Sequence, residues 1–336
     1  MVQSEEMQPY EQIKQLGERI RGNMAKVIAG KEDTIEKVLI CLFCGGHVLL
    51  EDVPGVGKTV LARSLARSVR CDYKRIQFTP DLLPSDLTGI NYYNQKMGEF
   101  VFRPGPLFAN IVLADEINRA TPRTQASLLE CMEERQVTID GETHPLHAPF
   151  FVIATQNPVE THGTFPLPEA QLDRFTMRLR MGYPAFADGR SILDRFEQEN
   201  PLDTLESVTT CRELAEVQRL FCRVRVCGAV KDYILEIIEQ TRQDEKILLG
   251  VSPRGSLALM KAAQVYAGFR GRPFVTPDDV KKMAVPVLSH RILLKTTSFN
   301  GPLQQAEHRI GELLGRVRVP VEALEWNESR QAGEEP

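Results

Sequence analysis

Asp52-Val53-Pro54-Gly55-Val56-Gly57-Lys58-Thr59 is the stretch that decides the fold of this chain. It follows an apolar run and precedes a helix-like run, which places it at a turn between a strand and a helix. Gly55 and Gly57 allow backbone N–H groups to close around a polyphosphate, and Lys58 reaches the β- and γ-phosphates. Thr59 offers its hydroxyl to Mg²⁺ at the positive end of the following helix. The stretch predicts a phosphate-binding loop for a nucleoside triphosphate.

One position departs from the general pattern G-x-x-x-x-G-K-[ST], because this chain has Asp52 where the pattern has its first glycine. The Gly-x-Gly-Lys-Thr core is intact. An ordinary glycine-rich turn between a strand and a helix is the alternative interpretation of such a stretch. A second, independent motif favours the nucleotide site.

That second motif is Ile111-Val112-Leu113-Ala114-Asp115-Glu116, four apolar residues followed by two carboxylates. A continuous apolar run is typical of a strand buried on both faces. Asp115 at the strand end can hold the hydration shell of Mg²⁺, and Glu116 can orient and deprotonate a water. Alone, an Asp-Glu pair is more often part of a solvated loop. Together with the phosphate-binding loop it predicts hydrolysis rather than transfer to a substrate hydroxyl.

Composition sets the outer bounds. The chain has 336 residues, 42% of them hydrophobic and 26% charged, which is ordinary for a globular protein with one large and one small domain. The first ten residues lack the apolar core of a signal peptide, and no run of eighteen apolar residues occurs. We therefore expect a cytoplasmic protein without membrane insertion. The net charge of −4 weighs against sequence-independent nucleic-acid binding but leaves a local basic pore open.

Seven cysteines are scattered along the chain with no second paired spacing that would complete a zinc site. Cys41 and Cys44 carry the C-x-x-C letters of a redox or metal motif. They lie in or beside a stretch, residues 34–43, whose apolar spacing is that of a packed helix. We expect most of the cysteines, including these two, to be small buried apolar residues.

The organisation of the chain changes near Tyr183-Pro184. Before it, five strand-like runs alternate with amphipathic helices, which predicts a parallel sheet covered by helices; the runs are residues 48–50, 75–78, 111–114, 150–154 and 175–179. Beyond it, four segments have helical periodicity and little strand signal; they are residues 211–221, 231–241, 254–268 and 277–284. The predicted domains are an α/β core at 1–183, a helical domain at 184–325 and a polar tail at 326–336.

Two predicted β-hairpins interrupt the α/β pattern. The first joins residues 90–93 to 99–102 around Lys96-Met97-Gly98, and the second joins residues 136–139 to 142–144 around Asp140-Gly141, a strong turn dipeptide. Surface decoration is the alternative to a functional role for such insertions.

These motifs stand in the order of an AAA+ ATPase. They are the phosphate-binding loop, Asp115-Glu116, Asn157 in Ala154-Thr155-Gln156-Asn157-Pro158, residues 168–175, and Ser252-Pro253-Arg254. More narrowly, residues 115–120 and 128–134 resemble phrases of the MoxR family, and the resemblance spans about Val27 to Ile292. It implies an AAA+ P-loop core with a parallel sheet and hairpin insertions, followed by a smaller helical lid.

The resemblance also implies roles for single residues. Asn157 would be the sensor 1 residue that helps to hold the attacking water, although it also suits a turn before Pro158. Arg174 would be an arginine finger for the neighbouring subunit, the alternative being a surface ion pair with Asp173 or Glu169. Arg254 would be the sensor 2 residue that links the lid to the γ-phosphate.

The implied nucleotide site is larger than the phosphate-binding loop. Val27-Ile28-Ala29-Gly30 resembles the segment that cradles adenine. With it, the residues implied to bind ATP are Ile28, Gly30, Pro54, Gly55, Val56, Gly57, Lys58, Thr59 and Val60, and those implied to hold Mg²⁺ are Thr59 and Asp115. Arg119 and Arg123 follow the carboxylates closely but receive no assigned role, and His162 is a second departure from the family pattern.

A finger that acts on a neighbour requires assembly, so the resemblance predicts a ring, most simply a hexamer. It further implies chaperone-like remodelling or activation of a client protein, with a partner that carries a von Willebrand factor A domain. The hairpins would face the central pore.

Three alternatives come from other functional classes. A nucleic-acid motor related to MCM-type ATPases would need basic hairpin tips, where this chain has only Lys96. A nucleotide-gated scaffold without turnover conflicts with the intact Glu116. A small-molecule kinase would need an acceptor pocket that the sequence does not indicate.

Overall fold

The computed structural model describes residues 7–158, 163–197, 199–295 and 302–320. They form two compact units: one is Glu18–Glu216, and the other combines the described residues up to Gly17 with those from Val217 onward. This division falls later in the chain than the predicted one near Tyr183-Pro184, and it adds the start of the chain to the second unit. The predicted tail at 326–336 lies outside the described residues.

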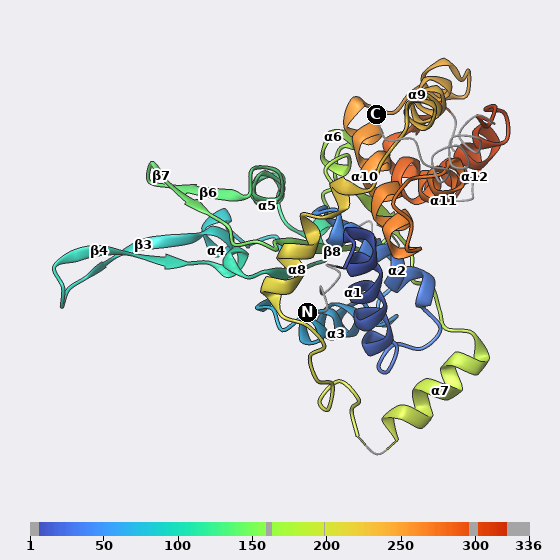
Figure 1. The fold of residues 1–336 in the computed structure, drawn as a ribbon. Helices are drawn as coiled ribbons and strands as arrows, with labels where there is room; N and C mark the ends of the chain where they lie inside the picture. Colours follow the sequence, from blue (N-terminus) through green and yellow to red (C-terminus); the bar gives the residue numbers. More distant parts are fainter. Residues whose placement is uncertain (1–6, 159–162, 198, 296–301, 321–336) are drawn as a thin grey trace, which may run out of the picture. The chain divides into compact units, whose positions relative to one another are not determined.

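The Glu18–Glu216 unit is built on a five-stranded parallel sheet (Figure 1). In spatial order its strands are β2 (Tyr73–Gln77), β5 (Ile111–Asp115), β8 (Phe151–Gln156), β1 (Val48–Glu51) and β9 (Met177–Leu179). Every residue of β1 and β5 is buried, as expected for strands covered on both faces. All five predicted strands are present, and each boundary lies within two residues of the predicted one. The predicted α/β core is confirmed.

Helices and short 3₁₀ turns connect these strands. They are α1 (Pro9–Met24, which crosses into this unit), α2 (Glu32–Phe43), α3 (Lys58–Ser68), α4 (Pro84–Thr88), η1 (Pro106–Phe108), η2 (Ile117–Arg119), α5 (Pro122–Glu134), α6 (Glu169–Leu172), α7 (Phe186–Phe196) and α8 (Cys211–Gln218). Cys41 lies within α2 and Cys44 is its C-cap, and both are buried as expected. The C-x-x-C letters therefore belong to a packed helix.

Both predicted hairpins are present and extend away from the sheet (Figure 1). They are β3 (Gly89–Asn94) with β4 (Glu99–Pro104), and β6 (Gln136–Ile139) with β7 (Glu142–Pro145). Asp140 and Gly141 both have positive φ, at 50° and 86°, as a two-residue hairpin turn requires. Asn91 donates to Asp140 at 2.8 Å, and the rings of Phe102 and His144 stack with centroids 4.3 Å apart. The two hairpins therefore contact each other.

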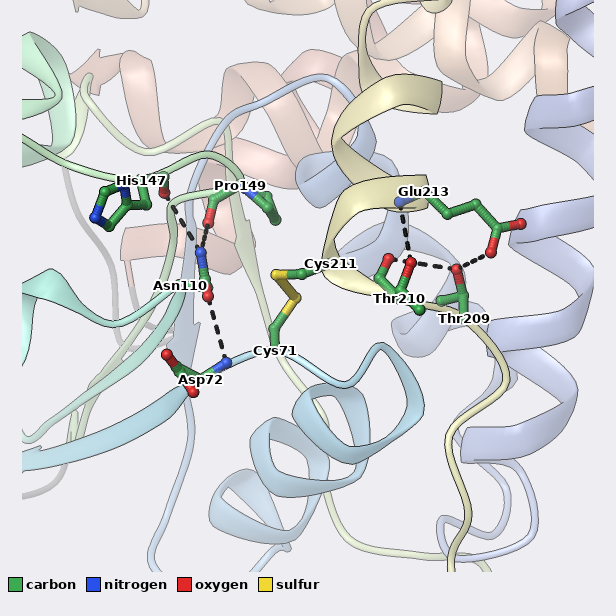
Figure 2. The surroundings of a disulfide bond; sticks show 9 residues. All are labelled: Cys71, Asp72, Asn110, His147, Pro149, Thr209, Thr210, Cys211 and Glu213. Carbon is green, nitrogen blue, oxygen red and sulfur yellow. Dashed lines mark hydrogen bonds between the residues drawn. A yellow bond between two sulfur atoms is a disulfide. The ribbon is translucent and has the colours of Figure 1, made fainter.

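A disulfide joins Cys71, just after α3, to Cys211, the first residue of α8 (Figure 2). Only Cys41, Cys44 and Cys131 are buried, so the expectation that most of the seven cysteines are small buried residues is wrong. The Cα atoms of Cys71 and Cys211 lie 5.1 Å apart although 140 positions separate them in the sequence. Spacing alone could not pair them, because the fold brings them together. Disulfides are rare in cytosolic proteins, so this bond weighs against the expected cytoplasmic location, which stays a prediction.

The second unit is mainly helical. Its elements are η3 (Phe221–Arg223), α9 (Gly228–Gln243), β10 (Ile247–Leu249), α10 (Pro253–Phe269), α11 (Pro277–Leu288), η4 (Ser289–Arg291), β11 (Leu293–Leu294) and α12 (Pro302–Leu314). The short antiparallel pair β10–β11 was not predicted. Thr276 caps α11 by accepting from the Asp279 N–H, and Pro277 occupies the first turn, where proline is favoured. None of the described helices combines the length and apolarity that a membrane crossing needs.

Candidate functional site

The phosphate-binding loop lies between β1 and α3, at the carboxyl end of the sheet strands. Gly55 and Gly57 have φ of +85° and +96°, a backbone region that side chains rarely adopt, so glycine is required at both positions. The Lys58 ammonium donates to the Asp52 carbonyl at 2.7 Å. Burial lowers the pKa of Lys58, while the nearby negative charges of Asp115 and Glu116 act in the opposite direction. The loop follows β1 and the carboxylates follow β5, on either side of β8 in one parallel sheet, so the lysine and the carboxylates lie at the same sheet edge.

The contacts of Asp52 account for an aspartate at the position where the common loop pattern has glycine. Its carboxylate accepts hydrogen bonds from the backbone N–H groups of Met181 and, at 3.0 Å, Gly182. The residue is only 7% exposed. These bonds fasten the first residue of the loop to the chain that leaves β9.

The two acidic residues are positioned by the neighbouring strand. Asp115 ends β5 and Glu116 follows it in a left-handed conformation with φ of 57°, an uncommon geometry for a residue with a side chain. Thr155 on β8 donates to Asp115 at 2.6 Å and accepts from the Glu116 N–H at 2.8 Å. Thr155 thus fixes both carboxylate-bearing residues, a role that sequence reasoning missed.

Strand β2 supplies two further partners that the sequence analysis did not identify. Arg75 pairs with Asp115, its Nη2 lying 2.6 Å from Oδ2. Gln77 donates from Nε2 to the Glu116 carboxylate at 2.7 Å. Residues two apart on a strand point to the same side, and β2 pairs with β5 in a register that sets Gln77 opposite Asp115. The polar residues at positions i and i+2 of this strand were the sequence signal that could have identified both partners of the acidic motif.

Arg119, which received no assigned role, also contacts the site. Its Nε lies 3.1 Å from Oε2 of Glu116, the same oxygen that Gln77 contacts. Glu116 is therefore held from two sides.

The three residues implied by the family resemblance lie in different places. Asn157 follows β8 and is 5% exposed; because β8 lies between β1 and β5, Asn157 is at the same sheet edge as the loop and the carboxylates. Arg174 lies between α6 and β9 and pairs at 3.3 Å with Glu133 of α5, rather than with Asp173 or Glu169. Arg254 belongs to the other unit, as the second residue of α10.

The segment expected to cradle adenine lines a cavity of about 240 Å³ that reaches the phosphate-binding loop. Its walls are mostly apolar and are formed by Val27, Ile28, Ala29, Lys31, Gly55, Val56, Gly57, Val60, Met181, Tyr183, Pro184, Ile192 and Phe196. Gly30 has φ of +67°, and a Cβ there would lie 2.1 Å from a carboxylate oxygen of Asp188. Small apolar walls next to phosphate-binding N–H groups suit a nucleotide with a flat base.

The donor set also fits magnesium. Thr59 and Asp115 offer hard oxygen ligands, and Mg²⁺ typically takes one or two protein oxygens together with substrate phosphates. Within the described residues no group of three or more His, Cys, Asp or Glu side chains could form an all-protein metal cage.

Comparison with known proteins gives two family matches. Residues 47–177 match the ATPase family associated with various cellular activities (AAA), and residues 239–312 match the AAA lid domain. The first match contains the loop and the carboxylates, and the second lies in the helical unit.

Individual relatives cover most of the chain. The uncharacterized protein YeaC of Bacillus subtilis is 54% identical over 88% of this chain and 92% of its own. The chaperone MoxR1 of Mycobacterium tuberculosis is 41% identical over 82% of this chain and 75% of its own. The crystal structure of a Cytophaga hutchinsonii protein has a TM-score of 0.84 at 36% identity, over 93% of this chain and 97% of that chain.

Proposed function

The chain belongs to the MoxR family of AAA+ ATPases, and from that premise we propose that it hydrolyses ATP within a ring and uses the energy to remodel or activate a client protein. The observation that carries the proposal is the convergence of Lys58, Asp115 and Glu116 at one edge of a parallel sheet, next to an apolar cavity. That edge is where such sheets bind their ligands.

Each residue of the site has one step in this proposal. The N–H groups of the loop and the Lys58 ammonium bind the β- and γ-phosphates, and Val27, Ile28 and Ala29 cover the base. Thr59 and Asp115 would hold Mg²⁺, which would supply positive charge to the phosphate oxygens. Glu116 orients and deprotonates the attacking water, and Asn157 at the same edge positions that water.

Assembly into a ring, most simply a hexamer, would bring a positively charged side chain of one subunit to the nucleotide of the next. Among the described contacts of Arg174 the ion pair with Glu133 is present and none reaches the loop of its own subunit. We assign Arg174 to the nucleotide of the neighbouring subunit, where its guanidinium offsets charge that develops on the γ-phosphoryl group. Arg254 of the helical unit reports loss of that phosphate as a movement of the lid.

In this proposal, ATP hydrolysis drives a mechanical change in a client protein. The exposed hairpins, joined through Asn91 and Asp140, are the elements placed to contact a client. The resemblance to the MoxR family favours a partner with a von Willebrand factor A domain. A nucleic-acid motor is the competing class, and the test below separates the two.

Steady-state ATP hydrolysis and solution mass are measured for the intact chain, Glu116→Gln and Arg174→Ala, with and without single-stranded and duplex DNA. Lys281→Ala, a change at a lysine of the helical unit outside the site, serves as the control. We expect DNA-independent turnover, loss of turnover by at least a hundredfold in both variants, and an ATP-bound ring trapped by Glu116→Gln. Turnover that requires DNA would replace the proposal with the nucleic-acid motor, and Arg174→Ala at full rate would remove the finger assignment.

A further inference from the structure

A second cavity of about 450 Å³ lies at the end of α3 remote from the phosphate-binding loop. Since α3 has 11 residues, the two ends of this helix are about 15 Å apart. The proposed ATPase mechanism uses none of the side chains that line this cavity, which include Arg63, Arg67, Arg70, Cys71, Asp72 and Tyr73.

Positive charge dominates the wall. Arg63 and Arg67 are four residues apart and lie on one face of α3. Arg70 follows the C-cap of α3 with φ of 47° and joins them in the cavity lining. Arg67 donates to the Leu202 carbonyl and lies 3.8 Å from Asp203. The side chains of Arg63 and Arg70 make no hydrogen bond or ion pair with any part of the chain that the structure describes. Asp72 supplies the single opposing charge in the lining.

The helix dipole explains the positions of some of these arginines but not of all three. Basic side chains near a helix C-terminus are favoured by the helix dipole, which suits Arg67 and Arg70 but not Arg63 near the middle of α3. The phenol oxygen of Tyr73, also in the lining, is buried and lacks a hydrogen-bond partner among the described residues. Because this oxygen is closed to solvent, the arginine side chains and not the Tyr73 hydroxyl would meet an anion in the cavity.

The Cys71–Cys211 disulfide (Figure 2) forms part of the same site, because Cys71 lines the cavity. Its partner Cys211 begins α8, where Thr210 accepts from the Glu213 N–H at 3.2 Å. The positive end of a helix stabilises a thiolate, so Cys211 is the better leaving group of the pair. The segment before Cys211 is also fastened to α3 by a hydrogen bond from the Val208 N–H to the Ser68 carbonyl at 2.9 Å.

We propose that this cavity is a thiol-exchange site that takes a small anionic thiol, drawn in by Arg63 and Arg70. The thiolate attacks Sγ of Cys71, a new sulfur–sulfur bond forms, and the Cys71–Cys211 bond breaks. The bonding electron pair leaves with Cys211, which becomes a thiolate and takes a proton from water. A second thiolate then attacks the mixed disulfide and releases an oxidised dimer of the small thiol with Cys71 as a thiolate.

The exchange removes the covalent link between α3 and the start of α8. Residues 199–210 precede α8, and the disulfide is their only covalent attachment to α3. With the disulfide open, non-covalent contacts alone hold this segment to α3, among them the Arg67–Asp203 ion pair and the hydrogen bond from Val208 to Ser68. The site therefore couples the thiol state of its surroundings to the segment that leads into the helical unit.

The test uses the oxidised full-length chain and two matched probes, anionic 2-mercaptoethanesulfonate and neutral 2-mercaptoethanol. Intact mass spectrometry measures the rate at which each thiol opens the Cys71–Cys211 disulfide. Peptide mapping identifies the cysteine that carries the adduct. The ratio of the anionic to the neutral rate is compared between the Arg63→Ala/Arg70→Ala variant and an Arg103→Ala/Arg190→Ala control, which removes the same charge from exposed positions outside the cavity. Each protein reports its own neutral rate, so a general loss of folding does not mimic the effect.

We expect the ratio to fall about tenfold in the cavity variant and to fall with added salt, because the attraction is electrostatic. The adduct is expected on Cys71. Equal ratios in the two variants, an adduct on Cys211, or a disulfide that neither thiol opens in the folded chain would each overturn the proposal.

Discussion

Gln77 donates a hydrogen bond of 2.7 Å to the carboxylate of Glu116, the residue proposed to activate water. Arg119 contacts the same carboxylate oxygen at 3.1 Å. A carboxylate held by two donors is less free to turn toward a water molecule than an unrestrained one. In the conformation described, Glu116 is thus held in a resting state that a movement of β2 would release.

The first prediction is that Gln77→Leu raises ATP hydrolysis in the absence of any client. Loss of one hydrogen bond to a charged group changes its free energy by about 1 kcal/mol when a second donor remains, which corresponds to roughly a fivefold higher rate. The rate is measured at saturating ATP.

Gln243→Leu is the matched control, because Gln243 also donates to a glutamate, at 3.0 Å to Glu239, but on an exposed helix of the other unit. It is expected to leave the rate unchanged. A Gln77→Leu rate at or below that of the intact chain would show that Gln77 positions the base productively instead of restraining it.

The second prediction concerns Asp52, which joins the loop to Met181 and Gly182. Asp52→Gly restores the common loop pattern, yet it leaves two backbone N–H groups without their acceptor. We expect it to lower the free energy of unfolding by about 2 kcal/mol, and Asp52→Asn, which keeps one acceptor oxygen, to lower it by about half as much. Urea unfolding measures both. Equal stability of Asp52→Gly and the intact chain would contradict the structural role.

The sequence predicted the sheet, the loop and the acidic pair because each has a local signature. The continuous apolar run before Asp115 identifies a buried strand, and the glycines identify a backbone that only glycine adopts. Arg75 and Gln77 were missed since their role depends on which strand lies beside β5, and strand order leaves no mark in local periodicity. The Cys71–Cys211 bond was missed for the same reason.

The third prediction is that Cys211→Ser destabilises the chain. The disulfide closes a long loop within one unit, because its cysteines are 140 positions apart in the sequence. Removing a bond of this kind typically costs about 2–5 kcal/mol. We expect the thermal unfolding midpoint to fall by several degrees in Cys211→Ser, and the same fall in the intact chain after reduction.

Cys222→Ser is the control for that experiment, since Cys222 is an exposed thiol outside the disulfide. Its midpoint should match that of the intact chain. If reduction lowers the midpoint of Cys211→Ser as much as that of the intact chain, the stabilising bond is not the one described.

The environment of His47 is expected to make the free energy of unfolding depend on pH. Its ring is buried between two elements, with Nδ1 accepting from the Val152 N–H and Nε2 facing the Met132 carbonyl, both at 3.0 Å. Burial lowers the pKa of His47 from 6.5 to about 3, and the positive charge of Arg135 adds to the effect. The folded chain therefore keeps this imidazole neutral at pH values where the unfolded chain protonates it.

The fourth prediction is that a fall in pH destabilises the intact chain more than it destabilises His47→Gln. Below pH 6.5 the unfolded state binds a proton that the folded state does not, so the free energy of unfolding decreases as pH falls, by up to about 1.4 kcal/mol per pH unit until pH approaches 3. Between pH 7 and pH 5 the contribution is about 2 kcal/mol. His47→Gln should lose about that much less over the same interval, whereas His308→Gln, at an exposed histidine, should follow the intact chain. Urea unfolding at the two pH values measures the difference, and a His47→Gln variant with the same acid dependence as the intact chain would show that another group is responsible.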